Sequence, residues 1–80
     1  MTREALLSGL NDIFNDVLDQ TDIQLKDTTT ADDVMDWDSL SHIQLIVAIE
    51  RHFKIKFTTA EIANFRNVGE MCDAIMKKIA

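Results

Sequence analysis

The sequence predicts an all-α protein, a small four-helix bundle of three longer helices and one short helix, with a long loop between the first two. Apolar residues recur at steps of three and four in several segments, the spacing that gathers them on one face of a helix. The chain has no Pro and only two Gly, the residues that most often interrupt helices. At 80 residues it is short, so we expect a single domain, residues 1–80, with a small core.

The first helix is predicted from Thr2 to about Asp19. Its periodic apolar positions are Leu6, Leu7, Leu10, Ile13, Phe14, Val17 and Leu18. Residues 20–36 have no such period and are rich in Thr and Asp, which favour turns and caps. We therefore expect a long connection there, and loops of that length in so small a domain are usually functional.

The second helix is predicted to begin after Asp38, a good N-cap, and to end near Phe53. At about 100° per residue its apolar residues form two stripes instead of one. One stripe consists of Leu45, Ile46, Ile49 and Phe53, and the other of Leu40, Ile43 and Val47. Because one stripe is enough for a core, the second either packs under the long loop or is an exposed docking patch.

Two further helices follow, each with a sequence signal for its start. Thr58 and Glu61 have the spacing of a capping box, which predicts a short helix through Phe65. Asn67 and Glu70 repeat that spacing, with Asn67 as the cap of the last helix. This helix should bury Val68, Met71, Cys72, Ile75 and Ile79.

The charge of the chain is concentrated in one stretch. Residues 27–50 hold six acids and neither Lys nor Arg, whereas the rest of the chain holds eight of each sign, so this stretch accounts for the whole net charge of −6. Such a field repels nucleic acid and anionic lipid and attracts basic protein surfaces. Because the acidic stretch ends on the second helix, it favours the docking interpretation of the extra stripe.

Other sequence features bear on location. No apolar run approaches the length of a membrane span, so we expect no membrane insertion. The first fourteen residues are interrupted by charges and lack the apolar core of a signal peptide. The single cysteine, Cys72, excludes an internal disulfide and fits a reducing compartment, so we expect a cytoplasmic protein.

Asp38-Ser39-Leu40 lies where the long loop enters the second helix. As a bare tripeptide it is ordinary capping chemistry. With Asp38 as cap and Ser39 in the first turn, however, the Ser39 hydroxyl should face solvent. A phosphodiester on it would lie at the positive end of the helix dipole, a placement worth roughly 0.3 to 1 kcal/mol.

The chain resembles the acyl carrier protein family, which also includes peptidyl and aminoacyl carrier domains. The resemblance covers nearly the whole chain and rests on Asp38-Ser39-Leu40, on the following Ile43-Gln44-Leu45 and Ala48-Ile49-Glu50 with Phe53, and on the order of the helices. It implies that Ser39 bears 4'-phosphopantetheine from coenzyme A, whose terminal thiol holds an acyl group as a thioester. It implies a monomeric carrier, not an enzyme.

The same resemblance implies the partners. A phosphopantetheinyl transferase would attach the arm, and a ligase or transferase would load the acyl group. Downstream synthase enzymes of a fatty acid, polyketide or related specialised pathway would then use it. Trp37 stands where many fatty acid carriers have a small residue, and His42, Gln44 and Arg51 dilute an often more acidic helix. The Trp-Asp-Ser-Leu form is more similar to specialised carriers.

The charge and the extra stripe together predict the partner-binding residues. An apolar groove of the partner would receive Leu40, Ile43 and Val47, while its basic rim would meet Asp36, Asp38 and Glu50.

The sequence leaves alternatives open. A rival hypothesis is an unmodified acidic helical adaptor that binds a basic protein through the same helix. A calcium sensor ranks third, because Asp32, Asp33, Asp36 and Asp38 lack the Gly and terminal Glu of an EF-hand.

We assign neither a metal ligand nor a catalytic residue. His42 is expected to be a satisfied, partly buried histidine, whereas His52 should lie on the polar face of the second helix. Cys72 is expected to be a small buried hydrophobe.

Overall fold

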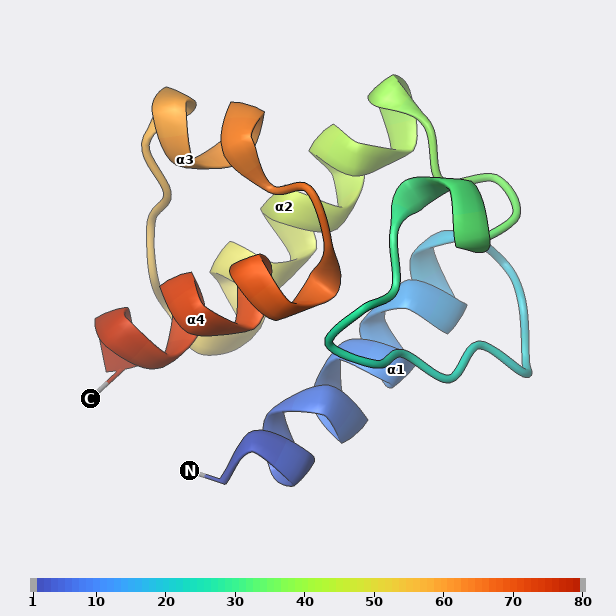
Figure 1. Ribbon diagram of the computed structural model, residues 1–80, viewed down its shortest axis with the longest axis horizontal. Coiled ribbons are helices and arrows are strands. Elements are labelled where there is room, and N and C mark those ends of the chain that lie inside the picture. The colour runs from blue at the N-terminus through green and yellow to red at the C-terminus, as the bar shows by residue number, and fades with distance from the viewer. Residues whose placement is uncertain (1, 80) are drawn as a thin grey trace.

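The computed structural model describes residues 2–79, and within that range every regular element is helical (Figure 1). The elements are α1 (Arg3–Val17), a 3₁₀ turn η1 (Ala31–Asp33), α2 (Ser39–Phe53), α3 (Thr59–Asn64) and α4 (Val68–Ile79). The prediction of three longer helices, one short helix and a long first connection is confirmed. Only η1, inside that connection, was not predicted.

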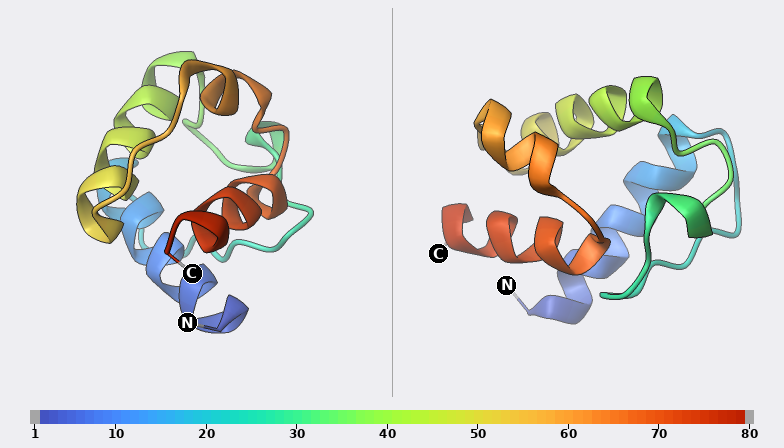
Figure 2. Two further views of the ribbon diagram at one scale, coloured as in Figure 1. Left: turned by 90° about the vertical axis from the view of Figure 1, so that its left-hand side faces the viewer. Right: turned by 45° about the horizontal axis from the view of Figure 1, so that its top comes forward.

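A single core lies between the helices, and α1 packs against both α2 and α4 (Figure 2). The fully buried side chains are Leu6, Leu10, Phe14, Leu45, Ile49, Val68, Met71, Cys72 and Ile75. The stripe of α2 that contains Leu45 and Ile49 is therefore the core stripe. The long loop and the segment before α2 add Leu25 and Trp37 to this core.

The first helix begins at Arg3, one residue after the predicted start, and ends two residues early. The Thr2 hydroxyl accepts a hydrogen bond from the amide of Ala5 at 3.1 Å, so Thr2 is its N-cap. At the other end Asp19 has a φ of 54°, in the left-handed region that stops a helix. The predicted boundary near Asp19 is wrong for this reason, and the helix ends at Val17.

The capping predictions for the two C-terminal helices are confirmed at their starts. Thr58 and Glu61 exchange backbone-to-side-chain hydrogen bonds of 2.8 and 3.1 Å, and α3 ends at Asn64 because Phe65 is extended. The Asn67 side chain accepts from the amide of Glu70 at 2.9 Å. In a complete capping box the Asn67 amide would donate to the Glu70 carboxylate. Here the Arg66 amide donates to it instead.

The predicted core face of α4 is confirmed at four of its five positions. Val68, Met71, Cys72 and Ile75 are buried, whereas Ile79 is only half-buried. Ile79 is the last residue of α4 and lies at the free end of the helix, where less of the core surrounds it (Figure 1).

The long connection is held to the bundle by side chains of α1. Asn11 accepts from the amide of Leu25 at 2.7 Å, and Asn15 accepts from the amide of Ile23 at 2.9 Å. Near the start of α4, the Arg3 guanidinium contacts Asp27 at 3.2 Å, Asp73 at 2.7 Å and the carbonyl of Gly69 at 3.1 Å. These bonds give the loop a defined path to the start of α2.

Candidate functional site

Ser39 is the first residue of α2, and its side chain is exposed as predicted. Asp38 before it is extended and caps the helix, with its carboxylate accepting from the amides of Leu40 at 3.0 Å and Ser41 at 2.9 Å. The predicted N-cap is confirmed. The cap places Ser39 at the N-terminal end of α2, on the surface, so a group attached to its hydroxyl oxygen can extend into solvent.

Ser41 completes this cap, a role that sequence reasoning missed. Its hydroxyl accepts from the amide of Asp38 at 2.8 Å and donates to the carbonyl of Asp36 at 2.7 Å. Ser41 is buried, and Asp36 has a φ of 69°, in the left-handed region that Asp tolerates better than most residues. The signal for Ser41 was its place three residues after the cap, the spacing of a capping box.

The pKa of Asp38 is lowered from its ordinary value, chiefly by the hydrogen bond from the Ser41 amide, with a smaller contribution from the Leu40 amide. Asp38 is therefore ionised at neutral pH and already occupies two amides of the first turn. The sequence argument that the helix dipole favours a phosphodiester on Ser39 is weakened, because this carboxylate neutralises much of that positive end.

Trp37 lies in the core and is tied to His42 on the first turns of α2. The indole Nε1 donates to His42 Nδ1 at 3.1 Å, and His42 Nε2 lies 3.3 Å from the carbonyl of Ile62 on α3. Because Nδ1 is the acceptor, the ring proton is on Nε2 and is donated to Ile62. The expectation of a partly buried, hydrogen-bonded His42 is confirmed. The Trp37 ring also packs edge-on against Phe14, with 4.9 Å between the ring centroids.

A hollow of about 580 Å³ opens beside Ser39. It is lined by Ala31, Asp32, Trp37, Asp38, Ser39, His42, Ile62, Ala63 and Phe65. The lining combines two acids with aromatic and aliphatic side chains. Such a lining, next to an exposed hydroxyl, suits a flexible arm with both amide and methylene groups.

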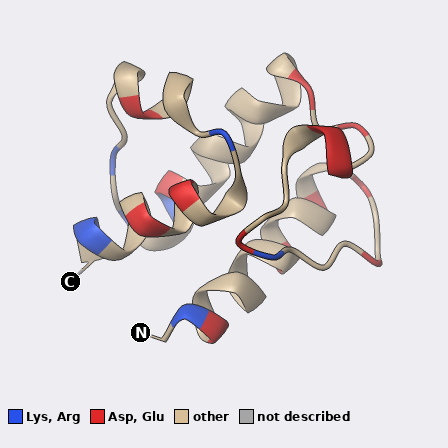
Figure 3. Cartoon of the chain, viewed as in Figure 1, with Lys and Arg blue, Asp and Glu red and all other residues tan. Residues whose placement is uncertain are grey.

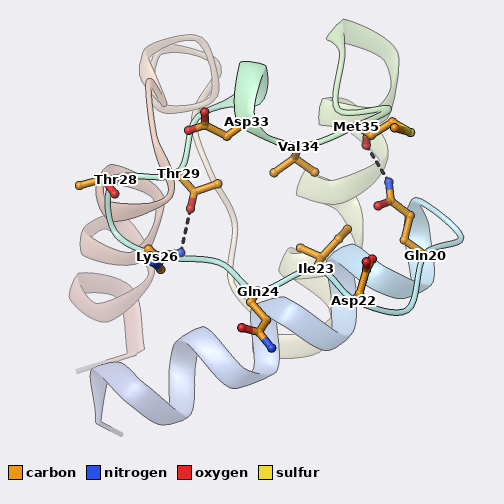
Figure 4. Close-up of a pocket in the computed structure, with 10 residues that line it drawn as sticks. All are labelled: Gln20, Asp22, Ile23, Gln24, Lys26, Thr28, Thr29, Asp33, Val34 and Met35. Carbon is orange, nitrogen blue, oxygen red and sulfur yellow. Dashed lines mark hydrogen bonds between the residues drawn. The ribbon is translucent and has the colours of Figure 1, made fainter.

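A separate hollow of about 470 Å³ lies within the long loop, whose residues form its whole lining (Figure 4). Hydrogen bonds from Gln20 Nε2 to the Met35 carbonyl, at 2.7 Å, and from the Lys26 amide to the Thr29 hydroxyl, at 2.9 Å, hold its rim. The turn η1 gives Asp33 to this hollow and Asp32 to the one beside Ser39. Ser39 does not line it, so it is not part of the candidate site.

The second stripe of α2 is exposed. Leu40, Ile43 and Val47 are 72%, 52% and 42% exposed, so the alternative that they pack under the long loop is wrong. Met35 in that loop is 75% exposed and was not predicted as part of this surface. Its signal was a large apolar residue beside Asp36 in the loop that leads to the Asp38 cap.

The predicted acidic positions do not form one cluster. Asp36 and Asp38 are exposed at the Ser39 end of α2. Glu50 lies near the other end, half-buried, and its Oε2 accepts from the amide of Phe57 at 2.8 Å. Figure 3 shows acidic residues on η1 and just before α2, with others on α1, α3 and α4, and basic residues in the segment that follows α2.

The remaining candidates from the sequence were metal ligands and the side chains of His52 and Cys72. Among residues 2–79 no three His, Cys, Asp or Glu side chains lie close enough together to hold a metal ion. His52 is exposed, and its ring lies edge-on to Phe53 at 4.7 Å. Cys72 is buried as expected, and burial raises the pKa of its thiol to about 11.

Comparisons with known proteins identify the family. A family model described as a phosphopantetheine attachment site matches residues 8–75. An acyl carrier protein of Acidothermus cellulolyticus is 34% identical over 94% of this chain and 89% of its own length. The chain belongs to the acyl carrier protein family. One from Myxococcus xanthus is 32% identical to the carrier, over 92% of this chain and 94% of its own.

The likeness extends to three dimensions. The solution NMR structure of holo acyl carrier protein from Geobacter metallireducens superposes on the carrier with a TM-score of 0.85 and 45% identity, covering 91% of this chain and 84% of that one. The carrier thus bears a covalent 4'-phosphopantetheine group, holds acyl groups and works with synthase and transferase enzymes without being an enzyme itself.

When bound, the arm supplies the thiol that holds the acyl group as a thioester. The residues of the carrier itself do the positioning, because the Asp38 and Ser41 cap fixes the first turn of α2. In the described part of the chain, none of the helices is both long and apolar enough to span a membrane.

Proposed function

We propose that Ser39 is the residue that bears the 4'-phosphopantetheine arm. The observation that supports this most strongly is the contrast among the three serines of the chain. Ser41 is buried with its hydroxyl bonded to Asp36, and Ser8 lies on α1, away from the hollow. Ser39 is exposed, lines that hollow and follows Asp38 within the segment that the family model matches.

The enzymes that act on the carrier dock on the exposed stripe of α2. We propose that Leu40, Ile43 and Val47 enter an apolar groove of each partner and that Asp36 and Asp38 meet its basic rim. The phosphopantetheinyl transferase, the acyl-loading ligase or transferase and the synthase enzymes all need access to the Ser39 end, which this stripe adjoins. Exposed apolar side chains support such a use, as do Asp36 and Asp38, which form no ion pair with another described residue.

Glu50 has a structural role besides any contact with a partner. Its bond to the Phe57 amide fixes the turn between α2 and α3, and it lies beside Arg51 instead of with the other acids. A charge reversal at Glu50 would therefore disturb the turn as well as the docking face. We infer that Val47→Ala is the cleaner probe of docking, because the change removes methyl groups from the exposed stripe and breaks no side-chain hydrogen bond.

We propose a specialised acyl pathway, within the range of fatty acid, polyketide and related biosynthesis. Trp37 and His42 support this, since their hydrogen-bonded side chains give the hollow beside Ser39 an aromatic lining. We further propose that the carrier acts as a monomer, whose net charge of −6 opposes self-association, and that it acts in the cytoplasm. The buried free thiol of Cys72 is compatible with a reducing compartment.

Intact-mass measurement tests the attachment site. The wild-type chain, Ser39→Ala and the control Ser8→Ala are each incubated with a phosphopantetheinyl transferase and coenzyme A. We expect one phosphopantetheinyl group on the wild type and on Ser8→Ala, and none on a folded Ser39→Ala. Modification of Ser39→Ala would refute the assignment, and an unmodified wild type would favour the rival adaptor hypothesis.

A further inference from the structure

We propose that the docking face of α2 is bipolar, and that the phosphopantetheinyl transferase of this carrier matches it. The transferase would present basic groups opposite Asp36 and Asp38, and acidic groups opposite Arg51 and Lys56. This inference rests on the proposed attachment at Ser39 and adds what the partner must look like at the far end of the helix.

The acidic end lies around Ser39. Asp32 and Asp38 line the hollow beside it, and Asp36 lies in the turn before the cap. All three are exposed, and in the described part of the chain none of them is in an ion pair. Their charge is therefore available to a partner.

The basic end lies around the last turn of α2 and the segment after it. A hollow of about 490 Å³ there is lined by Val47, Glu50, Arg51, Lys54, Ile55 and Lys56. It holds three bases against one acid, and the Glu50 carboxylate is bonded to the Phe57 amide. Arg51, Lys54 and Lys56 are exposed and form no ion pair with another described residue.

Val47 connects the two ends. It is the last residue of the exposed stripe that begins at Leu40, and it also lines the basic hollow. The stripe therefore leads from the acids at Ser39 directly to the bases. A partner long enough to cover the stripe meets both charges.

The two ends act on a partner separately. Fifteen residues of α-helix span about 22 Å, which exceeds two Debye lengths of about 8 Å at physiological salt. A partner therefore experiences a negative field at Ser39 and a positive one at the far end, and not their average. Figure 3 shows acidic residues on η1 and before α2, and basic residues in the segment after α2.

The chemistry of the transferase reaction explains why its two ends should differ. Coenzyme A is a polyanion that must be held next to the Ser39 hydroxyl, so the enzyme needs positive groups there. A surface that stayed basic along the whole helix would place like charges against Arg51 and Lys56, which costs affinity. Acidic groups at the far end remove that cost and fix the direction in which the helix docks.

The test compares two pairs of charge reversals. Arg51→Glu with Lys56→Glu changes the basic end, whereas the control pair Lys77→Glu with Lys26→Glu changes other surfaces. Each pair combines one base from the last turn of a helix with one from a loop, and all four residues are exposed. Both pairs replace two positive charges by two negative ones.

The measurement is kcat/KM for modification by the transferase encoded in the same genome, at low and physiological salt. We expect the Arg51 and Lys56 pair to lower kcat/KM about tenfold at low salt, less at higher salt, with the control pair unchanged or slightly faster. Val47→Ala should lower it at both salt concentrations alike.

The sign of the effect decides the proposal. A uniformly basic transferase would modify the Arg51 and Lys56 pair faster than wild type, and that result would overturn the proposal. An equal kcat/KM for this pair and the control pair would overturn it too. Circular dichroism checks that both double variants are folded. Sedimentation checks for a dimer of the carrier, because a second copy bound to the stripe of α2 would also overturn the proposal. Failure to modify the wild type refutes the proposed function instead.

Discussion

The indole of Trp37 donates a hydrogen bond to Nδ1 of His42 at 3.1 Å, which leaves the other ring nitrogen of His42 to bind the Ile62 carbonyl at 3.3 Å. One imidazole thus joins the segment before Ser39, the helix that Ser39 begins and the short helix α3. The short helix α3 has no fully buried residue, and this contact joins it to α2.

His42→Phe should destabilise the carrier although it keeps an aromatic ring at this place. The variant removes both bonds and leaves the Trp37 N–H and the Ile62 carbonyl without partners, which costs about 1–3 kcal/mol of unfolding free energy. Chemical denaturation followed by the fluorescence of the single tryptophan measures it. His52→Phe, at an exposed position, is the control and should stay within about 0.5 kcal/mol. Equal stability of the two variants would contradict the account of His42.

Asp38→Asn should change how stability depends on pH. The folded-state pKa of Asp38 lies below its ordinary value of 3.8, so its contribution is present above that value and is lost as the pH falls through the folded pKa. Asn caps helices as well as Asp does but does not titrate there. Urea denaturation between pH 6 and pH 2 should therefore show a smaller acid-induced loss for the variant than for wild type. Parallel profiles would show that the Asp38 carboxylate is not stabilised by its cap.

Cys72 should be unreactive in the folded carrier. Burial raises its thiol pKa to about 11, so almost no thiolate forms at neutral pH and the reagent has no access. Alkylation by iodoacetamide at pH 8 should label the holo form once, on the arm, and the apo form not at all. Urea should expose Cys72 to the reagent. Rapid labelling of the native apo form would contradict the buried position.

The two glycines should respond oppositely to alanine. A Cβ on Gly69 would lie 2.8 Å from the Asp27 carbonyl, a backbone atom that cannot move freely, so Gly69→Ala should cost about 1–3 kcal/mol of unfolding free energy. A Cβ on Gly9 meets only side-chain atoms at 3.8 Å or more. Gly9→Ala should therefore stabilise α1 by about 0.5–1 kcal/mol. Thermal denaturation of both variants tests the close packing of α4 on the loop.

Sequence reasoning succeeded where a pattern is local. The caps Asp38, Thr58 and Asn67, the core stripe of α2 and the exposed stripe beside it all follow from spacings within one helix. The Asp38 cap and the exposed position of Ser39 could therefore be predicted, but the part that Ser41 takes in the cap was missed.

What it missed depends on contacts between distant segments. The Ile62 carbonyl lies twenty residues from His42, and Arg3 binds Asp73 across seventy. Glu50 was predicted to be a docking acid, because its position in the helix pattern gives no sign of a bond to Phe57. The Phe57 amide reaches the Glu50 carboxylate only because the chain turns at Lys54, which has a φ of 57°. No periodicity encodes such turns, since they depend on the packed bundle.

Fragmentation of the intact holo carrier in a mass spectrometer tests the central claim most directly. Backbone cleavage on either side of Ser39 separates it from Ser41 and from every other hydroxyl of the chain. We predict that one phosphopantetheinyl group is found on every fragment that contains Ser39 and on no fragment that lacks it. A group on a fragment without Ser39, Ser41 included, would contradict the account.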